Sequence, residues 1–299
     1  MKGVFSTYLS GIRLLFFRWK AWAIVFIANI IFAFIIARPF GALLDKVGAN
    51  NEAALGGLSK FDADFIVDVL NNFGPEINLI IGQAFFIVVL YLILNIFLSG
   101  GIIESYVYLF QRFTFGEFLS NCAKHFWRMM RLALYFIGVQ ILVAGVMFAI
   151  YSKLGLSPFE LESEGELIFQ TQIMLGIFVI LMVWIDMVNE YAKVRVVLEK
   201  NRRFILPTLI DTKFFCLRHF FPILLLFLLC MLTFIAFLGI YTTLNDMFAM
   251  TSMSSLILAL LIGQLYLFFR VGVRLLFTST AIDYLRSKDW GEQHKTLSS

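Results

Sequence analysis

The stretch YLSGIRLLFFR, residues 8–18, is the first of three short basic segments that each precede a long apolar run. The other two are FLSNCAKHFWR (118–128) and TLIDTKFFCLR (208–218). When the three are aligned, leucines coincide at the second position and arginines at the last, namely Leu9, Leu119 and Leu209, and Arg18, Arg128 and Arg218. The pattern predicts three hairpins, each introduced by an elbow helix, here meaning an amphipathic helix that lies in the plane of the membrane surface. The expected repeats are residues 4–114, 115–203 and 204–291, followed by a flexible tail at 292–299.

The composition excludes a soluble domain. Of 299 residues, 61% are hydrophobic and only 15% are charged, and Phe alone contributes 35 residues. The mean hydropathy is +0.88. A chain of this size cannot enclose so many large apolar side chains in water, whereas in a bilayer they can face the acyl chains.

Six apolar stretches are long enough, or nearly so, to cross a hydrocarbon core that needs about 20 residues. They are residues 21–37, 77–98, 132–151, 167–187, 222–241 and 254–276. The first is followed by Arg38 and Pro39 and not by a small-residue cleavage site, so it is interpreted as a span and not as a signal peptide. The expected fold class is an all-α integral membrane protein with six transmembrane helices.

The basic residues orient these spans. With the N-terminus inside, all but four of the 24 Lys and Arg face the cytoplasm; the exceptions are Arg38, Lys46, Lys60 and Lys153. The positive-inside rule then places both termini in the cytoplasm and indicates a multi-pass protein of a bacterial inner membrane.

The elbow helices carry basic residues beside an aromatic-rich apolar face. Cations on such a helix are attracted to anionic lipid headgroups at about 1 kcal/mol each. The alternative is a plain elbow that only sets the angle of the next span. The residues expected at this lipid interface are Arg13, Arg18, Lys124, Arg128, Lys213 and Arg218.

Two outer segments and one inner segment have further patterns. Apolar residues at helical spacing in 61–73 predict an amphipathic helix on the outer surface. The second outer loop opens with a capping pattern at Ser157 and then alternates glutamates at 160, 162, 164 and 166, which favours a solvated acidic collar over a cation site. Residues 77–110 are apolar for longer than a bilayer requires, so the helix either projects into the cytoplasm or breaks, most easily at Ser99-Gly100-Gly101.

The sequence contains no recognisable catalytic pattern. His125, His219 and His294 form no HExxH motif, and the chain has no GxSxG and no P-loop. The cysteines at 122, 216 and 230 have neither disulfide nor metal-ligand spacing. We therefore expect a non-enzymatic protein without metal, cofactor or nucleic-acid partner.

Charges within the spans are the strongest candidates for a functional site, because charge is costly in hydrocarbon. Asp186 and Glu190 are an i, i+4 pair at the inner end of the fourth span, and Arg270 and Arg274 are an i, i+4 pair at the inner end of the sixth. We predict that the two pairs form one ion-pair network. The alternatives are that all four reach headgroups and water, or that the network is a transport gate. Single amides in the spans are expected to form interhelix hydrogen bonds: Asn29, Gln83, Asn95, Gln140 and Gln264.

Two functions are favoured by the sequence, and an intramembrane enzyme is the third hypothesis. The first is an accessory, scaffold or lipid-organising subunit of a membrane complex, in contact with anionic headgroups and with protein partners. The alternative is a transporter or permease for a lipid or a small solute, which discrete Gly or Pro interruptions near the midplane would favour.

The topology can be tested by labelling introduced cysteines from the outer face. Segments 45–76 and 153–166 should be outside, and 111–131 and 193–218 should be cytoplasmic. We expect Asp64→Cys to be labelled in intact cells and Lys200→Cys to be protected until the membrane is permeabilised. The reverse pattern would overturn the orientation.

Overall fold

The computed structural model describes residues 3–50, 67, 71–108, 113–153, 164–199, 205–247 and 253–297, and all its regular elements in these ranges are α-helices. Their order is α1 (Val4–Phe17), α2 (Trp19–Asn50), α5 (Gly74–Val107), α6 (Phe115–Lys153), α7 (Glu164–Leu198), α8 (Ile205–Arg218), α9 (Phe220–Met247) and α10 (Met253–Leu297). The expected outer helix at 61–73 and the capped acidic loop from Ser157 fall largely outside these ranges.

Among the described residues, six helices are long and apolar enough to cross a membrane, which confirms the expected multi-pass architecture. The candidate spans are Trp19–Leu43, Gly74–Val107, Phe115–Lys153, Ile168–Leu198, Phe220–Met247 and Ile257–Lys288. The first extends past the boundary expected from the sequence, because α2 continues through Pro39.

The chain divides into two compact units, and residues 23–95 form the smaller one. This unit consists of most of α2 and the first part of α5. The Tyr91 hydroxyl donates a hydrogen bond of 2.8 Å to Oδ1 of Asn29, and the ring of Phe32 lies 5.5 Å from that of Tyr91. Asn29 is thus one of the amides that join two helices, as the sequence predicts.

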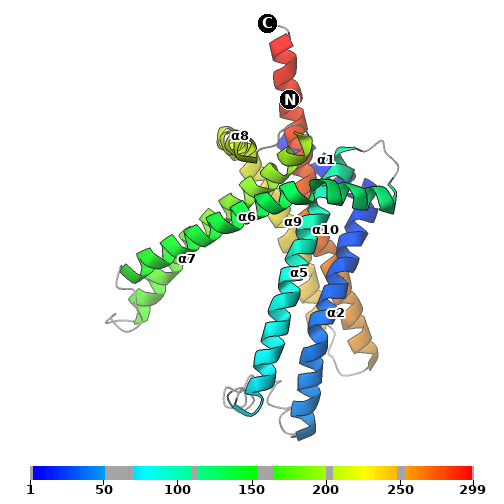
Figure 1. The fold of residues 1–299 in the computed structure, drawn as a ribbon, viewed down its shortest axis with the longest axis vertical. Coiled ribbons are helices and arrows are strands. Elements are labelled where there is room, and N and C mark those ends of the chain that lie inside the picture. The colour runs from blue at the N-terminus through cyan, green and yellow to red at the C-terminus, as the bar shows by residue number, and fades with distance from the viewer. Residues whose placement is uncertain are drawn as a thin grey trace. The chain divides into compact units, whose positions relative to one another are not determined.

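The larger unit contains residues 1–22 and 96–299. Within it, α10 packs against α1, α7 and α9, while α7 also packs against α6 and α8. In Figure 1 the α6–α7 and α9–α10 pairs leave the region of α1 and α8 as separate hairpins. The N-terminal α1 and the last turns of α10 lie at this same end, which we call the elbow end (Figure 1).

The three elbow segments do not all have the same form. A break at Arg18 separates α1 from α2, and a break at His219 separates α8 from α9. Pro222 lies in the first turn of α9 and favours the break between α8 and α9. Its ring nitrogen has no N–H to donate to a preceding carbonyl, and it restricts the backbone conformation of Phe221. In contrast, the second segment continues into its span without a break as the 39-residue helix α6. Arg128 is followed by Met, Met, Arg and Leu, which are all good helix formers.

The inward faces of the elbow segments also differ from the expected alignment. The buried residues include Thr7 and Gly11 in α1, whereas Leu9 is 50% exposed. Leu119 is also exposed, although Leu209 is buried. The aligned leucine position is therefore not a common packing position. The remaining buried residues at these faces are Leu15; Phe118, Cys122 and His125; and Thr208, Thr212 and Cys216.

Each elbow segment packs on the second helix of another hairpin within the larger unit. Segment α1 contacts α10, the start of α6 contacts the end of α5, and α8 contacts α7. One polar contact accompanies each pairing: Ser279 Oγ donates to the Gly11 carbonyl at 3.0 Å, His125 Nε2 is hydrogen-bonded to Glu104 at 2.6 Å, and Thr208 Oγ1 donates to Glu199 at 2.9 Å.

Ser99-Gly100-Gly101 does not break α5. The helix is continuous from Gly74 to Val107, and the two glycines instead allow α6 to approach closely. A Cβ at Gly100 would lie 2.7 Å from Cβ of His125, and one at Gly101 would lie 3.0 Å from the Phe118 carbonyl oxygen. The first distance is shorter than real Cβ contacts, and a Cβ at Gly101 would also clash with the Cys122 Sγ atom, so a larger residue at either position would force α5 and α6 to shift.

The close approach predicts an unusual response to alanine. In a helix, Gly→Ala normally stabilises by about 0.5–1 kcal/mol, but overpacking costs about 1–3 kcal/mol. We expect Gly101→Ala to lower the thermal unfolding midpoint of the detergent-solubilised protein. The matched control is Gly145→Ala in α6, where a Cβ would meet nothing within 4 Å; it should leave the midpoint unchanged or raise it. Equal shifts for both variants would contradict the α5–α6 contact.

Candidate functional site

A cavity of about 460 Å³ lies between α7, α9 and α10. Each helix contributes residues at i, i+3, i+4 and i+7, the spacing that places side chains on one helix face. The lining residues are Asp186, Asn189, Glu190 and Lys193 from α7; Phe227, Cys230, Met231 and Phe234 from α9; and Arg270, Val273, Arg274 and Phe277 from α10. The α7 wall is therefore polar and charged, the α9 wall is apolar, and the α10 wall is mixed.

The structure brings all four charges predicted from the sequence to this one cavity. Asp186 and Glu190 approach it from α7, and Arg270 and Arg274 approach it from α10. The positive charge of Arg274 acts on both carboxylates. Direct pairing of the acids with the arginines remains a prediction.

The two acids have further partners. Glu190 forms an ion pair of 2.6 Å with Lys193 and accepts a hydrogen bond of 3.0 Å from the Thr278 hydroxyl. Asp186 accepts a hydrogen bond of 3.0 Å from the Gln140 amide. Lys193 was not among the residues predicted for the network, although its position three residues after Glu190 is a local signal for an ion pair.

Two polar groups at the cavity have unused hydrogen-bonding capacity. The Asn189 Oδ1 atom is buried and has no hydrogen-bond partner among the described residues. Arg270 is exposed on the cavity wall, and within the same ranges no residue pairs with its guanidinium. Buried polar atoms in proteins normally have a partner, so a polar ligand or water in the cavity would satisfy Asn189 Oδ1.

The six basic residues expected at the lipid interface have different environments. Arg13, Lys124, Lys213 and Arg218 are exposed, as that role requires. Arg18 is a correction, because it is only 6% exposed and its Nη2 donates a 3.0 Å hydrogen bond to the Tyr108 carbonyl. Burial lowers the pKa of the Arg18 guanidinium. Arg128 is half-buried, and its Nη2 donates to the Glu199 carbonyl at 2.9 Å.

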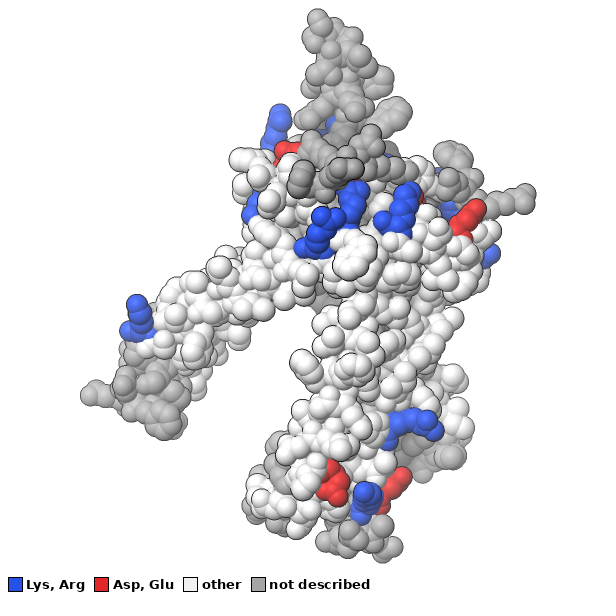
Figure 2. Space-filling view, viewed as in Figure 1, with Lys and Arg blue, Asp and Glu red and all other residues white. Residues whose placement is uncertain are grey.

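Arg18 and Arg128 therefore have a similar role. Each lies at the end of an elbow segment and binds a carbonyl just beyond the C-terminus of a second helix, where backbone oxygens lack intrahelical partners. Arg286 also donates to the Val107 carbonyl at the end of α5. On the face drawn in Figure 2, Lys and Arg side chains gather at the elbow end of the larger unit, and the helix shafts are mostly uncharged.

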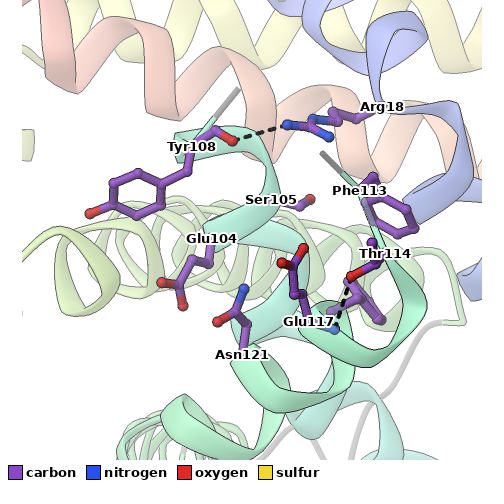
Figure 3. Close-up of a pocket in the computed structure, with 9 residues that line it drawn as sticks. Arg18, Glu104, Ser105, Tyr108, Phe113, Thr114, Glu117 and Asn121 are labelled. Atoms are coloured by element: carbon purple, nitrogen blue, oxygen red, sulfur yellow. Dashed lines mark hydrogen bonds between the residues drawn. The ribbon is translucent and has the colours of Figure 1, made fainter. Parts of the chain in front are cut away.

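A second, much smaller pocket lies at the elbow end, beside Arg18 and Tyr108. Figure 3 shows the Arg18–Tyr108 hydrogen bond on one side and the side chains of Glu117 and Asn121 on the other. Its volume is about 30 Å³, so it can hold water but no larger ligand.

Glu104 lines this pocket and also belongs to a polar cluster with His125 and Lys124. It is hydrogen-bonded to His125 and forms an ion pair of 3.3 Å with Lys124. No role for His125 was predicted from the sequence. A single acid within the apolar run 77–110 was the available signal, because a buried carboxylate requires a partner.

Three buried tyrosines were also missed. Tyr106, Tyr191 and Tyr284 lie in the C-terminal parts of α5, α7 and α10, and none of their hydroxyls has a hydrogen-bond partner among the described residues. Tyr191 and Tyr284 contact each other edge to face at 6.4 Å.

All three cysteines are free and buried, and burial raises the pKa of Cys216 to about 12, so this thiol stays protonated at neutral pH.

Known proteins offer no further guide. No family of known proteins matches this chain, and neither the curated proteins nor the solved structures contain a match. Across the described ranges, no group of three or more His, Cys, Asp or Glu side chains could hold a metal ion.

The ion-pair network can be tested by charge reversal. Asp186→Arg adds a further cation near Arg274 and Lys193, so we expect a lower thermal unfolding midpoint in detergent. An unpaired charge in a span costs up to about 2.5–3.5 kcal/mol at the bilayer centre and less towards the interface. Adding Arg274→Asp should restore most of the loss.

The control for this experiment is Arg13→Asp, a charge reversal at an exposed position of α1. It should leave the midpoint within about 1 °C of the wild type, since isolated surface charges contribute little. Failure of the double reversal to recover stability would reject the pairing of Asp186 with Arg274.

Proposed function

We propose that this protein is a non-enzymatic, multi-pass protein of a bacterial inner membrane that organises lipids as an accessory or scaffold subunit of a membrane complex. The observation that carries the proposal is the cavity between α7, α9 and α10. It combines charged side chains with an apolar wall formed by Phe227, Met231 and Phe234. A lipid has the same two-part chemistry, with a charged headgroup and an apolar chain.

The depth of the charged residues supports a lipid ligand. Asp186 follows the start of its span at Ile168 by 18 residues, which is about 27 Å along a helix at about 1.5 Å per residue. Arg270 follows the start of its span at Ile257 by 13 residues, or about 20 Å. Since the hydrocarbon core is about 30 Å thick, both charges lie in the half of it nearer the elbow end, where long side chains extend towards the lipid headgroups. The positive-inside rule assigns this half to the cytoplasmic leaflet.

The elbow end would add a second form of lipid contact. Arg13, Lys213 and Arg218 are exposed there beside apolar side chains that are also exposed, such as Phe214 and Leu217. This combination favours a helix that rests on anionic headgroups. Arg18 and Arg128 are assigned instead to holding the ends of α5 and α7 to the elbow segments.

The proposal includes three repeats of elbow segment plus hairpin. The support for the repeats is that each elbow segment packs on the second helix of the preceding hairpin. The first elbow segment packs on α10 of the third repeat, the second elbow segment packs on α5 of the first repeat, and the third packs on α7 of the second repeat. The facing residues favour an alignment of the first elbow that is shifted by one residue from the leucine match, so that Gly11 corresponds to Cys122 and Thr212. One hairpin cannot bury its own polar and small residues, whereas contacts between successive hairpins bury them against a neighbouring helix.

A transporter of a lipid or small solute is the second candidate. It is favoured by one observation, namely that polar atoms without partners among the described residues, such as Asn189 Oδ1, line a cavity within the spans. Proteoliposomes with a fluorescent lipid in one leaflet separate the two candidates. A transporter accelerates the exchange of that lipid between leaflets, whereas a lipid-organising scaffold leaves the rate at that of empty vesicles.

Lipid retention tests the main proposal. We expect native mass spectrometry of the protein, released from mild detergent, to show at least one phospholipid bound per chain. Met231→Arg should remove this lipid because a cation in the apolar wall is incompatible with an acyl chain. The matched control is Met247→Arg on the same helix, at a residue that is 76% exposed and lies far from the cavity. Wild-type protein without any retained lipid would reject lipid binding in the cavity.

A further inference from the structure

We infer that the cavity between α7, α9 and α10 selects a phospholipid whose headgroup is a phosphate linked to a primary ammonium, with Arg270 binding the phosphate and Asp186 binding the ammonium. This inference rests on the proposed function and goes further, because it assigns the headgroup and its direction across the cavity. It follows from the charges that remain after those engaged within the protein have been matched.

Two of the five charges at the cavity satisfy each other. Glu190 and Lys193 form an ion pair of 2.6 Å, and the second oxygen of Glu190 accepts a hydrogen bond from Thr278. This carboxylate therefore has partners on both oxygens. Arg274, on the opposite wall, is the second cation of α10 whose charge acts on Glu190 and Asp186.

Arg270 is the cation that remains for a ligand. It lines the cavity from α10, is exposed, and has no hydrogen bond or ion pair with any described residue. A guanidinium presents five N–H donors in a planar fork that matches two phosphate oxygens. At the headgroup level of the bilayer, lipid phosphate is the most abundant anion with this geometry.

The α7 wall offers acceptors for the other end of the headgroup. Asp186 uses one oxygen to accept a hydrogen bond from Gln140, and its side chain is otherwise exposed to the cavity. Asn189, three residues later on the same face, has a buried amide oxygen without a donor in the described part of the chain. An ammonium group has three N–H donors and no acceptor, so it suits two neighbouring oxygen acceptors.

The two walls together discriminate between headgroups. A phosphate plus a primary ammonium places one negative and one positive charge against Arg270 and Asp186, so both are compensated. A choline headgroup has no N–H to donate to Asp186 or Asn189, and a glycerol headgroup brings no cation to the Asp186 carboxylate. An unpaired polar group in a site penalises the ligand that fails to match it.

Binding of defined lipids to the full-length protein in detergent tests this assignment. Native mass spectrometry would be used to titrate phosphatidylethanolamine, phosphatidylcholine and phosphatidylglycerol with identical acyl chains. We expect phosphatidylethanolamine to bind about tenfold more tightly than either of the others, which corresponds to about 1.4 kcal/mol. Equal affinities for the three lipids would overturn the headgroup assignment and leave the lipid-binding proposal standing.

Two variants separate the two ends of the headgroup. Arg270→Gln should weaken all three lipids by about tenfold or more, and Arg270→Lys should recover part of the loss. Asp186→Asn should bring phosphatidylethanolamine down to the affinity of phosphatidylcholine and leave phosphatidylcholine unchanged. Lys153→Gln, at an exposed position at the end of α6, is the control for a loss of charge outside the cavity and should change none of the affinities. Each variant is measured at a temperature well below its own unfolding midpoint, so that a loss of binding does not report a loss of folding.

Soluble competitors identify the source of the phosphate. Glycerophosphoethanolamine and inorganic phosphate, each at millimolar concentration, should not displace the lipid, because they lack the chains that contact the α9 wall. Displacement by either one would overturn the lipid assignment and indicate a free phosphate ester or phosphate as the ligand. Absence of binding by every lipid tested would reject the proposed function together with this inference.

Discussion

The structure depends on how the backbone carbonyls at the ends of the second helices are satisfied. The last carbonyls of a helix have no intrahelical donors, and near a bilayer water is not always available to replace them. Arg18 donates to the Tyr108 carbonyl after α5, and Arg128 donates to the Glu199 carbonyl after α7. These contacts tie the first two elbow segments to the C-terminal ends of α5 and α7. Both contacts lie at the elbow end of the molecule.

The membrane spans could be predicted from the sequence because their signal is local. An apolar run of about 20 residues is typical of a transmembrane helix, and the chain has six such runs where the structure has six candidate spans. The cavity charges were also accessible, since i, i+4 pairs such as Asp186 and Glu190 must share a helix face. The sequence could not predict that α9 forms the opposing apolar wall. This helix is hydrophobic on every side, so its sequence does not distinguish one face from another.

The elbows were harder to predict because their joints depend on distant residues. The sequence between Arg128 and Leu132 contains no helix breaker, and α6 indeed continues. The break at Arg18 also lacks Gly or Pro, but there the side chain is bound to Tyr108, 90 positions away in the sequence. Similarly, Glu104 and His125 meet only because Gly100 and Gly101 let two helices approach. Such contacts are properties of the tertiary fold and leave little trace in a local pattern.

The unbroken α6 makes one elbow mechanically different from the other two. Its 39 residues form a rod of about 58 Å at about 1.5 Å per residue, roughly twice the thickness of the hydrocarbon core. A change in bilayer thickness alters the tilt of a span. The breaks at Arg18 and His219 let α2 and α9 tilt separately from α1 and α8, whereas any tilt of the unbroken α6 also moves His125 and Arg128. The hydrogen bonds of these two residues to Glu104 and Glu199 therefore couple the tilt of α6 to the ends of α5 and α7.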